Sequence, residues 1–315
     1  MMGTVRYANA VAAIRAMENS LLSRSDLDQL INAATKSERD NIVASKRGAG
    51  AEELTLESVW ETIRGYAPDC RELEILLYKN DFHNLKAALK SMIAGKEPQG
   101  YYIRPTNLDL DMLYPALAAK EYEQLPEHIR DTAAEAYELL TRTLDGQLAD
   151  SLADTACMRA MQKAAEKSGS TFMKKYAQLT TVCADIKTAY RCSRMKKQRS
   201  FIETAVCGSD ELDRDSLVRA ALGGAEGLLT FIENTSFGDA ARMLAESPAK
   251  FEKWCDDVIM ELAETARMEA FGADPLAAYY IAAEAELKNL RIISVCKESG
   301  TDRDTITERM RKLYV

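Results

Sequence analysis

Apolar residues recur at steps of three and four along most of this chain, which is the spacing of one buried helix face. The clearest run begins at Asp274-Pro275, an N-cap residue followed by proline in the first turn, and ends at Gly300. It therefore predicts a helix of about 25 residues. Its apolar stripe consists of Leu276, Tyr279, Ala283, Leu287, Leu290 and Ile293.

Two further runs have the same character. One opens at Pro68-Asp69 and ends near Gly95, and the other extends from about Ser170 to about Val206. The sequence shows no period-two alternation typical of strands, and its seven prolines and fifteen glycines are few for 315 residues. We therefore predict an all-α protein with loops around 46–51, 95–107, 208–213, 236–238 and 300–302.

A short phrase occurs three times within these runs: DFHNLKAALK at 81–90, VCADIKTAYR at 182–191 and EAELKNLRII at 284–293. Its polar centres, Asn84, Asp185 and Asn289, are 101 and 104 residues apart. That period is longer than the period of a solenoid repeat. We predict a single domain, residues 1–315, with three pseudo-repeated helical units anchored near 84, 185 and 289.

Each phrase is followed by a loop and an acid-bearing helix start: RPTNLDLDML, GSDELDRDSLV and GTDRDTITERM. Residues 14–31, IRAMENSLLSRSDLDQLI, repeat this ending without a phrase of their own before it. The two ends of the chain are therefore interpreted as partial units, which would suit a pseudo-threefold body that its termini close.

The three polar centres fall on otherwise apolar helix faces, together with Asp81 and Glu286 three residues before two of them. A buried polar group needs a hydrogen-bonding partner. We therefore interpret Asp81, Asn84, Asp185, Glu286 and Asn289 as structural anchors that fix helix packing, because an amide is a poor acid or base.

Basic residues lie on the opposite helix face from the anchors, at Lys86, Lys187 and Arg291. A second basic group, RCSRMKKQR at 191–199, includes Arg191, Arg194, Lys196 and Lys197. Solvated helix faces explain both groups simply. The alternative, which we retain as a hypothesis, is that they contact partner proteins.

Candidate catalytic chemistry is sparse. Asp256, Asp257 and Glu261 on one predicted helix resemble the Mg²⁺-binding motif of class I prenyl and terpene synthases, but no second motif of that form is present. The two histidines, His83 and His128, lack metal-site spacing, and neither a P-loop nor a GxGxxG loop occurs. The sequence therefore predicts no metal, no cofactor and no catalytic residue.

Composition narrows the classes of partner. The net charge of −8 disfavours general nucleic-acid binding, and the seven cysteines contain no CxxC pair, which is typical of a reducing compartment. The longest stretch without a charged residue is 275–283, far shorter than the roughly 20 residues of a membrane span. We expect no transmembrane segment.

The three phrases, the opening YANAVAAIRAMENSLLS and the closing PLAAYYIAAEAELKNLRIISVCKESG together resemble the C subunit of V-type ATPases and ATP synthases, a family that includes the eukaryotic d subunit. The resemblance covers the whole chain. It implies an all-α, funnel-like body of three similar units on the cytoplasmic face of a membrane. It also implies a non-catalytic role between the membrane proteolipid ring and the central shaft, coupling rotation to H⁺ or Na⁺ transport.

The match has departures. Val182 replaces the acid and Asp185 replaces the asparagine of the other two phrases, so the middle unit should pack differently. Ala12 and Ala13 stand where relatives are more basic, and Arg15 remains. A prenyl or terpene synthase built on Asp256, Asp257 and Glu261, and a helical adaptor for some other partner, remain the alternatives.

Overall fold

The computed structural model describes residues 6–48 and 54–315, and these residues form helices joined by turns, without a β-strand. This confirms the predicted all-α class. Contacts divide the chain into two compact units. Unit 1 combines residues 1–70 with 243–315, and unit 2 comprises residues 71–242.

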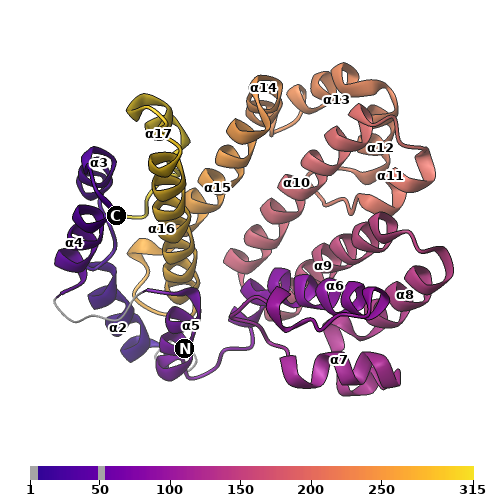
Figure 1. Cartoon of the computed structure of the whole chain (residues 1–315), viewed down its shortest axis with the longest axis horizontal. Coiled ribbons are helices and arrows are strands. Elements are labelled where there is room, and N and C mark those ends of the chain that lie inside the picture. The colour runs from indigo at the N-terminus through magenta and orange to yellow at the C-terminus, as the bar shows by residue number, and fades with distance from the viewer. Residues whose placement is uncertain (1–5, 49–53) are drawn as a thin grey trace. The chain divides into compact units, whose positions relative to one another are not determined.

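Unit 1 brings the two ends of the chain together. Its helices are α2 (Ala8–Glu18), α3 (Arg24–Asn32), α4 (Lys36–Arg47), α5 (Leu56–Tyr66), α15 (Pro248–Thr265), η4 (Ala266–Met268), α16 (Asp274–Glu298) and α17 (Arg303–Arg309). The indigo N-terminal helices and the yellow C-terminal helices lie side by side (Figure 1), with α16 in contact with α2, α3, α5 and α15.

Unit 2 holds the middle of the chain. Its helices are η1 (Leu73–Leu77), α6 (Tyr78–Ala94), η2 (Gln99–Tyr101), α7 (Leu110–Ala119), η3 (Tyr122–Gln124), α8 (Glu127–Thr143), α9 (Gly146–Ser168), α10 (Thr171–Arg194), α11 (Arg199–Ala205), α12 (Arg214–Leu222) and α13 (Gly224–Glu233). The remaining helix, α14 (Gly238–Glu246), spans the division between the units.

Small side chains let the helices of unit 2 approach closely. A buried stripe of Ala149, Ala153, Cys157, Met161 and Ala165 follows the four-residue period of α9. Helices α6, α8, α10 and α11 all pack against α9. The unit is therefore built around a single central helix.

In unit 1, an apolar cluster joins segments that are far apart in the sequence. Leu22, Leu27 and Leu30 from the N-terminal part pack with Ile293 of α16 and Ile306 of α17. The N-terminal ending, which has no phrase of its own, thus packs against the third phrase. Residues from both ends of the chain therefore share one apolar cluster.

Two predicted helical runs are interrupted. The run from Pro68 gives a 3₁₀ segment before α6 begins at Tyr78, and the run from Ser170 breaks between α10 and α11. The break occurs at Lys196, whose φ is +51°. The sequence pattern did not indicate this turn, because the left-handed residue that ends a helix is usually glycine and here it is lysine.

The same turn ends the phrase-bearing helix of each repeat. A left-handed residue follows eleven positions after each anchor, at Gly95, Lys196 and Gly300. In each case, the next amide donates to the carbonyl oxygen five residues before it, at 2.9, 3.0 and 2.9 Å respectively. These are Schellman caps, and their identical spacing from the anchors makes the ends of the three phrase-bearing helices equivalent.

We expect the unit 1 core to depend on residues from both chain ends. Leu22→Ala should lower the free energy of unfolding by about 2–5 kcal/mol, because Leu22 is fully buried in the cluster. Both tryptophans, Trp60 and Trp254, belong to unit 1, so their fluorescence reports on its unfolding.

The matched control is Leu113→Ala, which removes an equally buried leucine from α7 in unit 2. The tryptophan transition should move to lower denaturant concentration in Leu22→Ala and much less in Leu113→Ala. Equal shifts would contradict the division into two units.

Candidate functional site

The three anchors are buried, and each binds the backbone of the segment that returns after its own helix. The exposed fractions of Asn84, Asp185 and Asn289 are 0%, 3% and 0%. In each repeat, a short helix, η2, α11 or α17, precedes the bound segment. The first residue that the anchor binds lies two positions after the end of that short helix, at 103, 207 and 311.

The two asparagines bind in the same way. The Asn84 side chain donates to the carbonyl oxygen of Ile103 at 2.9 Å and accepts the N–H of the same residue at 2.8 Å. Asn289 makes the equivalent pair with Arg311, at 3.2 and 2.8 Å. Each amide thus satisfies both backbone groups of a residue that has no strand partner.

Asp185 performs this task with a different set of partners. An ionised carboxylate has no proton to donate, so its two oxygens accept the N–H groups of Cys207 at 2.9 Å and Gly208 at 2.6 Å. Burial raises the pKa of this carboxyl to about 6, although both hydrogen bonds act to lower it. The predicted difference of the middle repeat thus lies in which backbone groups it binds.

The acids three residues before the asparagines form a second contact. Asp81 accepts hydrogen bonds from the hydroxyl of Thr106 and from both the backbone and the side chain of Asn107. Its Oδ2 also lies 2.8 Å from Nε2 of His128. His128, one of the two histidines considered for metal binding, is thus in contact with the anchor residue Asp81.

Glu286 makes the corresponding contact with the N-terminal part of the chain. One carboxylate oxygen accepts the N–H of Leu22 at 2.6 Å, and the other forms an ion pair with Arg47 at 2.6 Å. In the first repeat, Asn107 lies two residues before Asp109, the N-cap of α7, while Leu22 immediately precedes Ser23, the N-cap of α3. In the first repeat, the segment that binds the acid follows later in the chain. In the third repeat, the segment that binds the acid comes from the N-terminal part of the chain.

The positions of the bound residues show that the three acid-bearing helix starts, aligned in the sequence, do not occupy the same place in each repeat. Asp109, Asp213 and Asp302 each cap a helix, as the acid-bearing starts predicted. However, the helix that Asp302 caps, α17, comes before the bound residue and matches α11, whereas α7 and α12 come after it. The pattern of one acid at a helix start could not distinguish these positions.

The acidic run at 256–261 binds the C-terminal segment of the chain. Asp256 pairs with Lys288 at 3.0 Å and with Arg311 at 2.8 Å, and Asp257 accepts the N–H of Lys312 at 2.7 Å. The ammonium of Lys312 lies 3.5 Å from the Glu261 carboxylate. These bases account for the run, so the prenyl-synthase hypothesis loses the observation on which it depended.

Arg15 also binds the C-terminal part of the chain. Its guanidinium donates to the carbonyl oxygens of Ala266 and Glu269 at 2.9 and 3.0 Å, and to the Tyr314 hydroxyl at 3.3 Å. The basic residue that remains in the opening segment is thus engaged within unit 1. Sequence reasoning missed both C-terminal contacts, because no local pattern shows which distant helix a tail meets.

The basic candidates differ in how far the chain itself uses them. Lys86 pairs with Asp154 at 2.5 Å, Lys197 donates to Gln147 at 2.7 Å, and Arg194 donates to the Tyr190 hydroxyl at 3.3 Å. Lys187 is exposed and interacts with other groups of the chain. Four of the seven bases therefore already interact with other groups of the chain.

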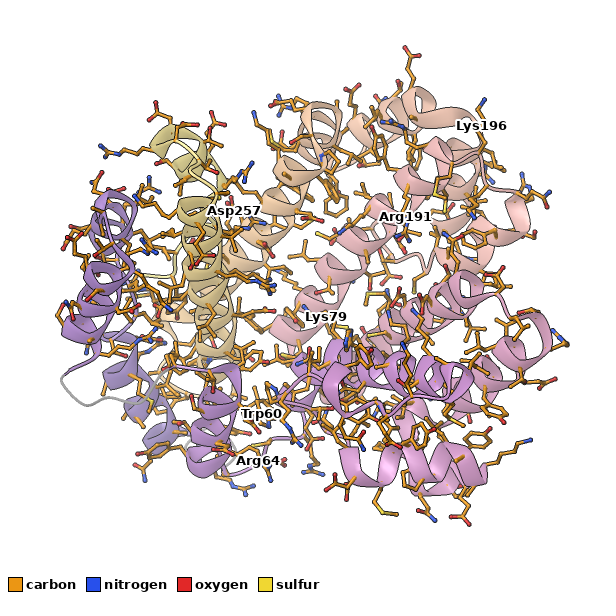
Figure 2. All side chains as sticks on the ribbon, in the orientation of Figure 1. Trp60, Arg64, Lys79, Arg191, Lys196 and Asp257 are labelled. Atoms are coloured by element: carbon orange, nitrogen blue, oxygen red, sulfur yellow. The ribbon has the colours of Figure 1, made fainter. Side chains whose placement is uncertain are left out.

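Three candidates remain available to a partner. Arg191, Lys196 and Arg291 are exposed and make no side-chain hydrogen bond or ion pair with any residue in 6–48 or 54–315. Figure 2 labels Arg191 on α10 and Lys196 just beyond its end. The left-handed turn at Lys196 places that side chain on the surface, where the Schellman cap leaves it exposed.

We expect the Asn289 anchor to stabilise unit 1 substantially. Asn289→Ala leaves the N–H and C=O of Arg311 without their partner, so the free energy of unfolding should fall by about 2–4 kcal/mol. Tryptophan fluorescence during denaturant unfolding measures it. The control is Asn41→Ala on exposed α4, which should change the value by less than about 0.5 kcal/mol. Similar values for the two variants would contradict the anchor role.

The raised pKa of Asp185 predicts a pH-dependent stability. The folded chain holds this proton more tightly than the unfolded chain, so Asp185 favours folding at pH 4 relative to pH 7. Compared with Asp185→Asn, the wild type should lose about 2–3 kcal/mol of unfolding free energy as pH rises from 4 to 7. Denaturant unfolding followed by circular dichroism at several pH values measures this difference. A difference between the two proteins that does not vary with pH would refute the assignment.

Comparison with known proteins gives two concordant matches. The family model described as ATP synthase (C/AC39) subunit matches residues 50–309. The C subunit of the V-type sodium ATPase of Enterococcus hirae is 23% identical over 260 residues, covering 81% of this chain and 79% of the relative.

Proposed function

Because this chain belongs to the ATP synthase (C/AC39) subunit family, which includes the C subunit of V-type ATPases, we propose that it couples rotation to ion transport in such a complex. It sits on the membrane proteolipid ring and receives the central shaft, and it takes no catalytic part in ATP turnover. The transported ion is H⁺ or Na⁺; the Enterococcus relative belongs to a sodium ATPase.

The observation that carries this proposal is the family match over residues 50–309. The anchors support it physically, because a subunit that passes torque must resist twisting. Buried polar groups that bind backbone in three places, each well inside a long helix, hold these helices against their neighbouring segments. We propose that Asp81, Asn84, Asp185, Glu286 and Asn289 serve as these rigid joints.

We further propose that the protein is peripheral and lies on the cytoplasmic face of the membrane. Across residues 6–48 and 54–315, the helices are too short or too polar to span a bilayer. Contact with the ring is then made through surface residues. Among the seven basic candidates, Arg191, Lys196 and Arg291 suit this role best, because their charges are exposed and have no hydrogen-bonding or ion-pair partner in the described part of the chain.

The proposed contact can be tested by charge reversal in the intact complex. We expect the triple variant Arg191→Glu, Lys196→Glu, Arg291→Glu to reduce ATP-driven ion transport by at least about threefold. The introduced carboxylates would repel the acidic partner groups that the three bases contact, and this repulsion weakens assembly. Transport is measured in membrane vesicles as ions moved per ATP hydrolysed.

The matched control reverses Arg24, Arg219 and Arg242, three exposed arginines that form ion pairs or hydrogen bonds within their own helices. Transport in this control should stay close to that of the wild type. Unchanged transport and normal incorporation of the first variant would remove these three bases from the interface.

A further inference from the structure

Unit 1 contains a groove between α4 and α16 that none of its own described side chains fills. The groove has a volume of about 520 Å³. Its apolar floor is formed by Leu30, Val43, Leu287, Leu290 and Ile293. Val43, Leu287 and Leu290 are only partly buried, so the floor exposes hydrophobic surface.

Helix α4 is poorly covered by its own chain. It spans 12 residues and contains no fully buried residue, whereas α16 buries much of its length. Ile42 and Val43 turn toward the apolar cluster of unit 1 but remain partly exposed. An isolated helix of this length is marginal in water, so most of its stability must come from packing. A partner on the exposed part of this face would supply the missing packing.

The rim of the groove is positively charged. Lys36 and Arg39 line it and make no side-chain hydrogen bond or ion pair with the described part of the chain. Arg291 lies one helical turn after Leu287 on α16, so it borders the same face. Arg47 also lines the groove, but its charge is neutralised by the ion pair with Glu286. Asp40 is the acidic residue among those that line the groove. In a chain of net charge −8, this positive rim favours an acidic partner.

We propose that this groove binds an amphipathic helix of another protein of the complex, with its apolar stripe on the floor and acidic residues beside Lys36, Arg39 and Arg291. A concave apolar channel between two helices suits a third helix, which presents apolar residues at i, i+3, i+4 and i+7. The charges of the rim set its orientation and its rate of association. This inference rests on the proposed function for the source of the helix, and it names the chemistry and the place of one contact.

The test places a photo-crosslinking phenylalanine analogue at Leu290 in the tagged full-length chain, expressed in its native host. The intact complex is illuminated in its membranes, and crosslinked peptides are identified by mass spectrometry. Leu222, at the end of α12 and outside the groove, carries the same analogue as the control. We expect Leu290 to capture one segment of another protein of the complex that has a helical apolar stripe and acidic flanks.

Charge variants make the test specific for the rim. The pair Lys36→Glu, Arg39→Glu should lower the crosslink yield at Leu290 by at least about fivefold, because opposed acids repel each other. Arg64→Glu, an exposed arginine of α5 that is labelled in Figure 2, should leave the yield unchanged.

Several outcomes would overturn the inference. These are no crosslink at Leu290, capture of lipid, capture of a second copy of this chain, or capture of a segment without acidic flanks. If other proteins of the ATPase are recovered with the tagged chain but Leu290 captures none of them, the groove proposal fails and the proposed function stands. If none of them is recovered at all, the proposed function fails.

Discussion

The structure depends on a single kind of interaction, a buried polar side chain that binds the backbone of a returning segment. Helices satisfy their own N–H and C=O groups, but a non-helical segment that packs against a helix brings unsatisfied groups into a water-poor place. Asn84, Asp185 and Asn289 remove that cost. Because each contact is directional, it also fixes where along the helix the segment lies.

The repeats keep this geometry while their chemistry varies. Asparagine pairs with both groups of one residue, and aspartate, which only accepts when ionised, takes the amides of two neighbouring residues. The left-handed residue eleven positions after the anchor is glycine twice and lysine once. A lysine in the left-handed conformation costs about 1–2 kcal/mol of conformational free energy. The turn forms at Lys196 in spite of this backbone preference.

The third repeat shows how the chain ends are used. Its anchor helix, α16, receives the N-terminal segment at Glu286 and the C-terminal segment at Asn289. The first repeat obtains both contacts from consecutive segments. In unit 1, the contacts of this anchor helix are thus completed by residues from both ends of the given sequence.

Much of this could be predicted from the sequence, and the part that could not has a physical reason. Helical periodicity located α16 nearly to the residue, and the polar residues singled out on apolar stripes are buried in the structure. The break at Lys196, the pairing of Asp256 with Arg311 and the role of His128 beside Asp81 depend on contacts between distant segments. Local patterns do not encode such pairings, so an acidic run that binds a basic tail resembled a metal motif.

The central claim is that this rigid, repeated body links a rotor ring to a shaft. The most direct measurement is gentle detergent isolation of the tagged full-length chain from its native membranes, with the ratio of the recovered proteins determined by quantitative mass spectrometry. The account predicts recovery of proteolipid and central-shaft proteins in fixed ratio to this chain. Recovery of the chain alone, while the rotary ATPase is intact in the same membranes, would contradict it.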